Sequence, residues 1–213
     1  MPTKPDTAGT TAVVLDALDD HGLLLMTDSA LPSVASLVSG EPITGSWWGH
    51  PRGRDIFAVV CEMADHADVL IAKLVSGKVT FIHRKHWAAV ITIGKAGEAW
   101  QMVRLSKESR KVLSAMVDSG HLTSDQMAEQ FGGQQKTWSK AVLELEKRLL
   151  VWSEQFHSDR GSHAKKIETW THWGRRIGFR PGKSGPDTAR HQMEKVLGRL
   201  NRQFLADGRL PWQ

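Results

Sequence analysis

Residues 122–173, which read LTSDQMAEQFGGQQKTWSKAVLELEKRLLVWSEQFHSDRGSHAKKIETWTHW, contain the pattern that decides the fold. Apolar residues recur at helical spacing in two segments separated by Gly132 and Gly133, and two strand-like segments follow. Thr123 precedes the first of these helices and is suited to cap it. The expected elements are a helix over 122–131, a helix over about 134–148, strands over 149–157 and 164–170, and a loop over 158–163.

This order of helix, turn, helix and hairpin resembles that of winged-helix DNA-binding proteins. The resemblance implies that the second helix enters a groove of DNA while a basic hairpin loop lies beside it. Nucleic acid, and duplex DNA above all, is therefore the first partner to consider. The pattern leaves open whether the protein is an enzyme.

Polar side chains gather at the start of the predicted second helix and around the hairpin loop. Gln can read adenine, Lys can read guanine or contact phosphate, and Ser suits phosphate. Trp138, Val142 and Leu145 are expected to form the core face of the same helix. The alternative is a solvated polar helix without a ligand. The predicted DNA-binding residues are Gln134, Gln135, Lys136, Ser139, Lys140, Arg160, His163, Lys165, Lys166, Arg175 and Arg176.

The N-terminal half is predicted to repeat this order. It has helix-like segments over 10–20, 29–38 and 51–66, and a hairpin over 69–83 that turns at Ser76-Gly77. The expected fold is α+β, mainly α with short β-hairpins, in a tandem winged-helix architecture with a C-terminal helix. The predicted domains are a disordered arm at 1–9, a winged-helix-like domain at 10–95, a winged-helix DNA-binding domain at 105–173, and a basic linker with an amphipathic helix at 174–213.

The tandem order also resembles, remotely, that of bacterial winged-helix DNA glycosylases of the crosslink-repair type. The resemblance covers the order of elements only. The catalytic Gln-x-Gln or Gln-x-Asp signature of those enzymes is not recognisable, because Gln134-Gln135-Lys136 differs from it in spacing and place. No catalytic residue is therefore transferred. The resemblance implies an alternative function in DNA repair, as a base-excision glycosylase or an abasic-site lyase.

The segment GSWWGHPRGR at 45–54 is the place where such chemistry would be sought. Trp47 and Trp48 are candidates for stacking on a base, and glycines around them allow close approach. The alternative is that both tryptophans fill the core. A lysine elsewhere could form a Schiff base with an abasic-site aldehyde, provided that it is buried. The candidate catalytic residues are His50, Glu62, Lys73 and Lys78.

Charge is divided unevenly along the chain. Residues 1–133 hold 12 Lys/Arg and 15 Asp/Glu, whereas residues 134–213 hold 16 Lys/Arg and 8 Asp/Glu. The positive charge therefore begins at the predicted DNA-binding helix and continues to the C-terminus. Such a basic surface attracts phosphate backbones with little regard to sequence.

Several classes of protein are disfavoured by the composition. No apolar run is long enough to span a membrane, and the N-terminus has no secretory h-region. The single cysteine, Cys61, is expected to be a buried core thiol and suits a cytoplasmic, nucleoid-associated protein. His157, His163 and His172 lack zinc-site spacing, and no cofactor motif is found, so neither metal nor cofactor is predicted.

A helix predicted over 187–206 carries an apolar stripe. Such a stripe must pack back on a domain, on a protein partner or on a second copy. The closing Leu210-Pro211-Trp212 is expected to dock on the fold. The linker before this helix, at 174–186, is basic, rich in Gly and Pro, and expected to be irregular. The segment at 94–97 is the predicted domain junction.

Overall fold

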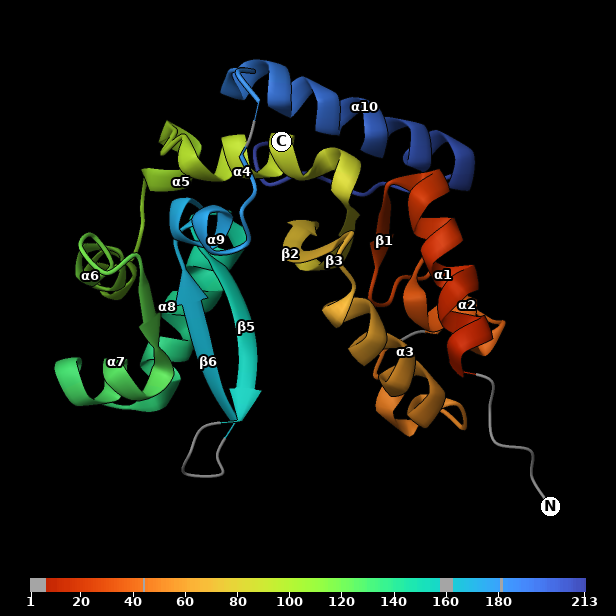
Figure 1. Ribbon diagram of the computed structural model, residues 1–213, viewed down its shortest axis with the longest axis horizontal. Helices are drawn as coiled ribbons and strands as arrows, with labels where there is room; N and C mark the ends of the chain where they lie inside the picture. The colour runs from red at the N-terminus through yellow and green to blue at the C-terminus, as the bar shows by residue number, and fades with distance from the viewer. Residues whose placement is uncertain (1–6, 44, 158–162, 181) are drawn as a thin grey trace. The chain divides into compact units, whose positions relative to one another are not determined.

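Residues 7–43, 45–157, 163–180 and 182–213 are described by a computed structural model (Figure 1). The structure is a mixed α+β fold, as the sequence predicts, with two three-stranded antiparallel sheets among many helices. The chain divides into two units: unit 1 holds residues 1–87, 191–211 and 213, and unit 2 holds residues 88–190 and 212.

Unit 1 begins with three helices and a short strand, and it ends its first segment with a hairpin. The elements are α1 (Thr7–His21), β1 (Leu23–Leu25), α2 (Val34–Ser39), the 3-10 turn η1 (Trp47–Gly49), α3 (Gly53–Asp65), β2 (Val69–Val75), β3 (Lys78–His83) and the 3-10 turn η2 (Arg84–His86). The sheet order is β1-β3-β2. In the core of unit 1, one face of each helix packs against the sheet. Fully buried core residues include Val14, Leu18, Ile56, Val59 and Phe81.

The hairpin of unit 1 lies where the sequence predicts it. Ser76 and Gly77 have φ values of 51° and 66°, which are the positive values that a two-residue hairpin turn of type I′ requires. Glycine adopts such a φ without strain, and Ser76 tolerates it at the exposed tip. Next to the turn Val75 lies opposite Lys78; an irregularity between Ala72 and Val75 then shifts the register, so that Ile71 lies opposite Phe81.

Three boundaries in unit 1 differ from those predicted. The first helix begins at Thr7, so residues 7–9 are helical rather than part of an arm, and residues 1–6 lie outside the described part of the chain. The second begins only at Val34, because Pro32 still accepts a backbone bond from Leu25 and Ser33 caps the helix. The third begins at Gly53.

Most of the C-terminal helix α10 (Pro186–Phe204) belongs to unit 1, from residue 191 onward. Its apolar positions Met193, Leu197 and Leu200 are at most 2% exposed, so the stripe is already covered within the chain. The segment after it docks as expected: Leu210 is 2% exposed, and the Ser76 amide donates to the carbonyl of Arg209. The predicted 174–213 segment is thus divided: residues 191–211 and 213 belong to unit 1, and residues 174–190 and 212 belong to unit 2. Because it is covered, the apolar stripe of α10 is removed as a docking surface for a partner.

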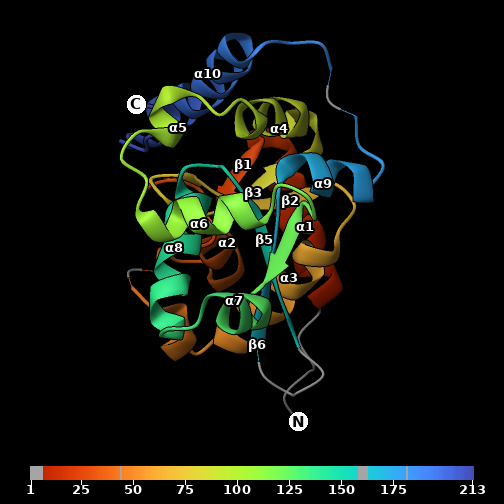
Figure 2. The same ribbon diagram turned by 90° about the vertical axis from the view of Figure 1, so that its left-hand side faces the viewer.

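Unit 2 has the same order of elements after two helices of its own. These are α4 (Trp87–Lys95) and α5 (Ala99–Met102), followed by α6 (Lys107–Ala115), β4 (His121–Thr123), α7 (Ser124–Phe131), α8 (Gln135–Lys147), β5 (Trp152–His157), β6 (His163–Glu168) and α9 (Trp170–Arg176). The sheet order is β4-β6-β5, which matches β1-β3-β2 of unit 1. Figure 2 shows α6, α7 and α8 with this sheet from the side.

The division between the two units falls between residues 87 and 88 and not at the predicted 94–97, and Gly94 lies within unit 2. A Cβ at Gly94 would lie 2.4 Å from the indole ring of Trp170, so glycine is required there by close approach. Trp170 itself is 1% exposed and begins α9 instead of ending a strand. Thr169 caps α9, which therefore places Arg175 and Arg176 on a helix and not in an irregular linker.

Residues 103–106 separate α5 from α6; Arg104 has a φ of 59° there, and the Ser106 side chain caps α6. One prediction in these units needs correction. Cys61 is exposed, not buried. It lies on α3 opposite the buried positions Ile56, Val59 and Met63, and helical periodicity therefore turns it toward solvent.

Candidate nucleic-acid interface

The helix α8 is held in unit 2 by an apolar face and by the turn before it. Trp138, Val142 and Leu145 are buried, as the sequence predicts, and the Trp138 indole N–H donates to the carbonyl of Gly132 at 2.7 Å. Gly132 and Gly133 have φ values of 63° and 79°, which end α7 and redirect the chain into α8. The start of α7 is fixed by the predicted cap at Thr123, in a capping box with Gln126.

The opposite face of α8 is exposed and basic. Lys136, Lys140 and Lys147 lie at positions i, i+4 and i+11, which is one stripe of a helix. None of the three forms an ion pair within the described part of the chain. Gln134, Gln135 and Ser139 are exposed beside them, so this predicted cluster is assembled on one surface.

Lys111 of α6 extends the basic surface at the start of α8. Its amino group lies 4.7 Å from the centre of the Phe131 ring and 5.6 Å from that of Trp138. These cation–π contacts hold the side chain over the α7–α8 turn. Lys111 and Lys147 are additions to the predicted set. The spacing of Lys147, seven residues after Lys140, could have identified it from sequence.

Three of the predicted cations, Lys165 and Lys166 on β6 and Arg176 on α9, have carboxylate partners. The Lys165 amino group lies 2.6 Å from Glu146, and Lys166 lies 3.0 Å from Glu168. Arg176 makes a bidentate contact with Glu168 at 2.6 and 3.0 Å. Because their charge is compensated within unit 2, these three side chains stabilise the fold, and their role in binding DNA stays a prediction.

Glu168 is fully buried and is stabilised as an anion by its neighbours. Burial alone would raise its pKa, but hydrogen bonds from Arg176 and Lys166 outweigh burial and hold the pKa below its usual range. His172 adds a contact of 2.9 Å from its Nδ1. The carboxylate therefore ties α9 to β6 across the end of the sheet.

The remaining predicted DNA-binding residues are described in part. Arg175 is exposed on α9. His163 pairs with His157 at the start of β6, but its side chain lies outside the described atoms. Arg160 lies outside the described residues.

The tryptophan loop of unit 1 is locked by its own hydrogen bonds. His50 Nε2 lies 3.0 Å from a carboxylate oxygen of Glu41, while Nδ1 accepts the Arg52 amide at 3.1 Å. Both ring nitrogens are therefore occupied. Trp47 is packed against the core, and Trp48 stacks on it with ring centroids 4.1 Å apart and remains 66% exposed. Of the two alternatives for this pair, core packing applies to Trp47, whereas the ring of Trp48 is exposed to solvent.

The other candidate catalytic residues lie on separate elements of unit 1. The Thr11 hydroxyl donates to Glu62 at 2.5 Å. Lys78 is half exposed and pairs with Asp28 at 2.7 Å, so the burial that a Schiff-base lysine needs is lacking there. Lys73 lies on β2 and is partly exposed. The two ring nitrogens of His50 are taken by Glu41 and Arg52 and not by any of these residues.

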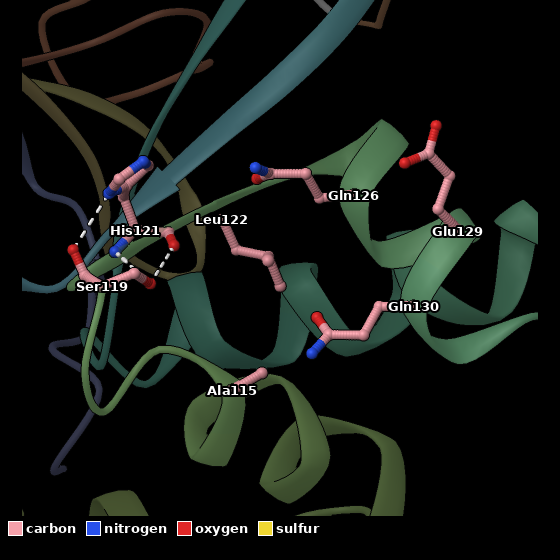
Figure 3. A pocket seen from close by; sticks show the side chains of 7 residues that line it. All are labelled: Ala115, Ser119, His121, Leu122, Gln126, Glu129 and Gln130. Atoms are coloured by element: carbon pink, nitrogen blue, oxygen red, sulfur yellow. Dashed lines mark hydrogen bonds between the residues drawn. The ribbon is translucent and has the colours of Figure 1, made fainter.

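An open depression of about 570 Å³ lies in unit 2 between α6, β4 and α7 (Figure 3). Gln126, Glu129 and Gln130 line it from α7, and Ser119 and His121 line its other side. Its polar lining includes a carboxylate and no lysine or arginine, which disfavours phosphate. It does not coincide with the basic face of α8.

Two classes of site are not found in the described residues. They contain no group of His, Cys, Asp and Glu side chains that could hold a metal ion. Among the helices searched, none is long and apolar enough to cross a membrane.

The charge of the chain is concentrated in the unit that carries α8. Unit 2 holds 17 Lys/Arg and 11 Asp/Glu, whereas unit 1 holds 11 Lys/Arg and 12 Asp/Glu. Comparison with known proteins finds no matching protein family, curated protein or solved structure. The functional argument therefore rests on the fold and on these surfaces.

Proposed function

We propose that the protein binds duplex DNA through unit 2, with α8 as the helix that enters the major groove. The observation that carries the proposal is the exposed lysine stripe of α8, which lacks carboxylate partners among the described residues. Lysines left unpaired on a helix are available to release counterions from phosphates, which is the main source of affinity for DNA.

The order of elements supports the same function. Helix, strand, helix, helix and hairpin, with a sheet order of first, third and second strand, is the order expected of a winged helix, and both units have it. We interpret the chain as a tandem of two such units. In a winged helix, the helix before the hairpin is the one that reads the groove. This helix is α8 in unit 2 and α3 in unit 1.

A salt titration of DNA affinity tests the proposal. Fluorescence anisotropy with a labelled duplex would be measured from low to moderate NaCl for the intact chain and for a triple variant, Lys136→Ala, Lys140→Ala and Lys147→Ala. The slope of log K against log salt is negative. Its magnitude should decrease by about 0.9 for each phosphate contact removed, hence by about 2 to 3 for the triple variant. A variant that alters both affinity and slope in this way supports α8 as the interface.

Lys195→Ala is the matched control, because Lys195 is an exposed lysine of α10 in unit 1. It removes one positive charge without touching α8 and should change neither affinity nor slope by more than a small amount. A triple variant with the slope of the intact chain would refute the proposal. Competition with single-stranded DNA and with RNA would establish the preference for duplex DNA.

DNA repair stays the alternative function, and the exposed ring of Trp48 is the observation that favours it. A stacked aromatic ring can hold an unpaired base. Against it, His50 has no free ring nitrogen for acid–base work in this structure. Incubation with duplexes containing uracil, alkylated bases or abasic sites is the test. Base release, strand scission or a borohydride-trapped adduct would establish the enzyme, and their absence across the panel would exclude it.

A further inference from the structure

The two corresponding helices, α3 and α8, present different chemistry to solvent. Opposite its buried face, α3 exposes a stripe of Arg54, Phe57, Cys61 and Asp65 at positions i, i+3, i+7 and i+11. Phe57 is 48% exposed and contacts the ring of Trp48, which is 66% exposed, with centroids 5.5 Å apart. This α3 stripe together with Trp48 is an aromatic patch between an arginine and a carboxylate, whereas the exposed charges of the α8 stripe are all lysines.

An acidic end makes the α3 stripe a poor surface for phosphates. Asp65 is exposed and unpaired within the described residues, and Glu62 lies one helical turn before it. Exposed aromatic side chains beside charges of both signs are more typical of a surface for another protein. The sign and order of the two end charges then specify which protein.

Arg54 and Asp65 lie at the ends of α3 where the helix dipole disfavours their charges. Arg54 lies in the first turn of α3, near the positive end of the helix dipole, and Asp65 is its last residue, near the negative end. Both charges would be stabilised by a second helix that runs antiparallel to α3. Eleven residues span about 16 Å, so the two side chains cannot pair with each other on one helix.

We infer that α3 is a self-association surface, on which a second copy of this chain packs its own α3 in antiparallel orientation. The stripe is complementary to itself: Arg54 of each copy faces Asp65 of the other, and Phe57 and Cys61 lie around the two-fold axis. Each contact of such an isologous pair occurs twice. Trp48 of each copy covers the edge of the aromatic contact. The dimer does not depend on DNA binding, and it would give the particle two copies of α8.

A charge exchange between Arg54 and Asp65 tests this arrangement. Analytical ultracentrifugation of the full chain would give the dimer dissociation constant. Arg54→Glu alone and Asp65→Arg alone should each weaken the dimer by about tenfold or more, because each places like charges together twice. The double variant should restore it to within about threefold. Since the two positions are too far apart to pair within one helix, restoration requires contact between copies.

The single cysteine supplies an independent measurement. In the proposed register the two Cys61 thiols lie within about 10 Å of each other. A short bis-maleimide should therefore convert the intact chain into a covalent dimer, and Arg54→Glu should suppress this product. Lys140→Glu, which makes the same charge change on α8, is the control and should leave crosslinking unchanged.

Misfolding would not imitate these results. Arg54 and Asp65 are exposed, and reversing either charge improves its interaction with the dipole of α3. At concentrations below the dimer dissociation constant, the unfolding temperature of each variant should therefore be no lower than that of the intact chain. A monomer at all concentrations, or a dimer that both single variants leave intact, would overturn the inference. Quenching of tryptophan fluorescence by single-stranded DNA that is lost in Trp48→Leu, without a dimer, would assign the patch to unpaired bases instead.

Discussion

His86 is a buried base that its surroundings keep neutral. Its side chain is 8% exposed, lies against Gly22, and contacts the amide nitrogen of Gln192 at 3.3 Å through Nδ1. Burial lowers its pKa to about 4, and the charges of Lys85, His83 and Arg199 act in the same direction. An ordinary histidine pKa is near 6.5. The unfolded chain therefore binds a proton in a range where the folded chain does not.

The depressed pKa of His86 predicts a loss of stability in acid. As pH falls from about 6.5 toward 4, protonation of the unfolded state lowers the free energy of unfolding, by about 2 kcal/mol at pH 5. Urea denaturation at pH 7.5 and pH 5 would measure this for the intact chain and for His86→Gln. The variant should lose about 2 kcal/mol less between the two conditions. An equal loss in both proteins would show that His86 is not the group responsible.

At the scale of elements, the junction of α1 and β1 depends on Gly22. Its φ is 78°, and a Cβ there would lie 2.4 Å from the imidazole of His86. Gly22→Ala should cost about 1 to 2 kcal/mol from the backbone and about 1 to 3 more from the overlap. Gly40→Ala is the matched control, because Gly40 has a φ of 82° at the end of α2 and open space around it. Denaturant unfolding should show the larger loss for Gly22→Ala, and equal losses would contradict the packing argument.

Local signals decided which elements could be predicted from the sequence. The unit 1 hairpin follows from β-formers around Ser76-Gly77, and α7 and α8 follow from Thr123, a glycine pair and helical spacing. The strand β4 has only three residues and is defined by its pairing with β6, more than 40 residues later, so no local pattern marks it. The helix α9 was missed for a similar reason, since Trp170 is placed by contact with Gly94.

The candidate interface likewise has one part that local sequence patterns predict and one part that depends on the fold. The exposed face of α8 was predictable, because helical periodicity alone separates Lys136 and Lys140 from the buried Trp138 and Val142. The state of the hairpin lysines was not. Lys165 finds Glu146 at a distance of 19 residues along the chain, and this partner is brought close only by the packing of α8 on the sheet. From the sequence alone, a lysine such as Lys165 is predicted to contact phosphate, although the folded chain places a carboxylate beside it.

At the scale of the whole molecule, unit 1 is assembled from both ends of the chain. Residues 1–87 pack with 191–211, so the core of unit 1 is complete only when α10 is in place. Arg199 of α10 donates to the carbonyls of Asp20 and His21 at the end of α1, and the Phe204 ring meets that of His21 with centroids 5.4 Å apart. We therefore expect the C-terminal helix to be required for stable folding of the N-terminal elements.

A pair of leucines at the end of α10 tests this dependence. Leu200 is fully buried and Leu205 is 93% exposed. Leu200→Ala should lower the free energy of unfolding by about 2 to 5 kcal/mol, whereas Leu205→Ala should change it by about 0.5 kcal/mol or less. Hydrogen exchange should locate the loss in α1 and the β2–β3 hairpin of unit 1. Because the proposed DNA interface lies on α8 of unit 2, Leu200→Ala should keep its affinity for duplex DNA under native conditions. Loss of protection throughout unit 2, together with loss of DNA binding, would instead mean that the two units fold as one.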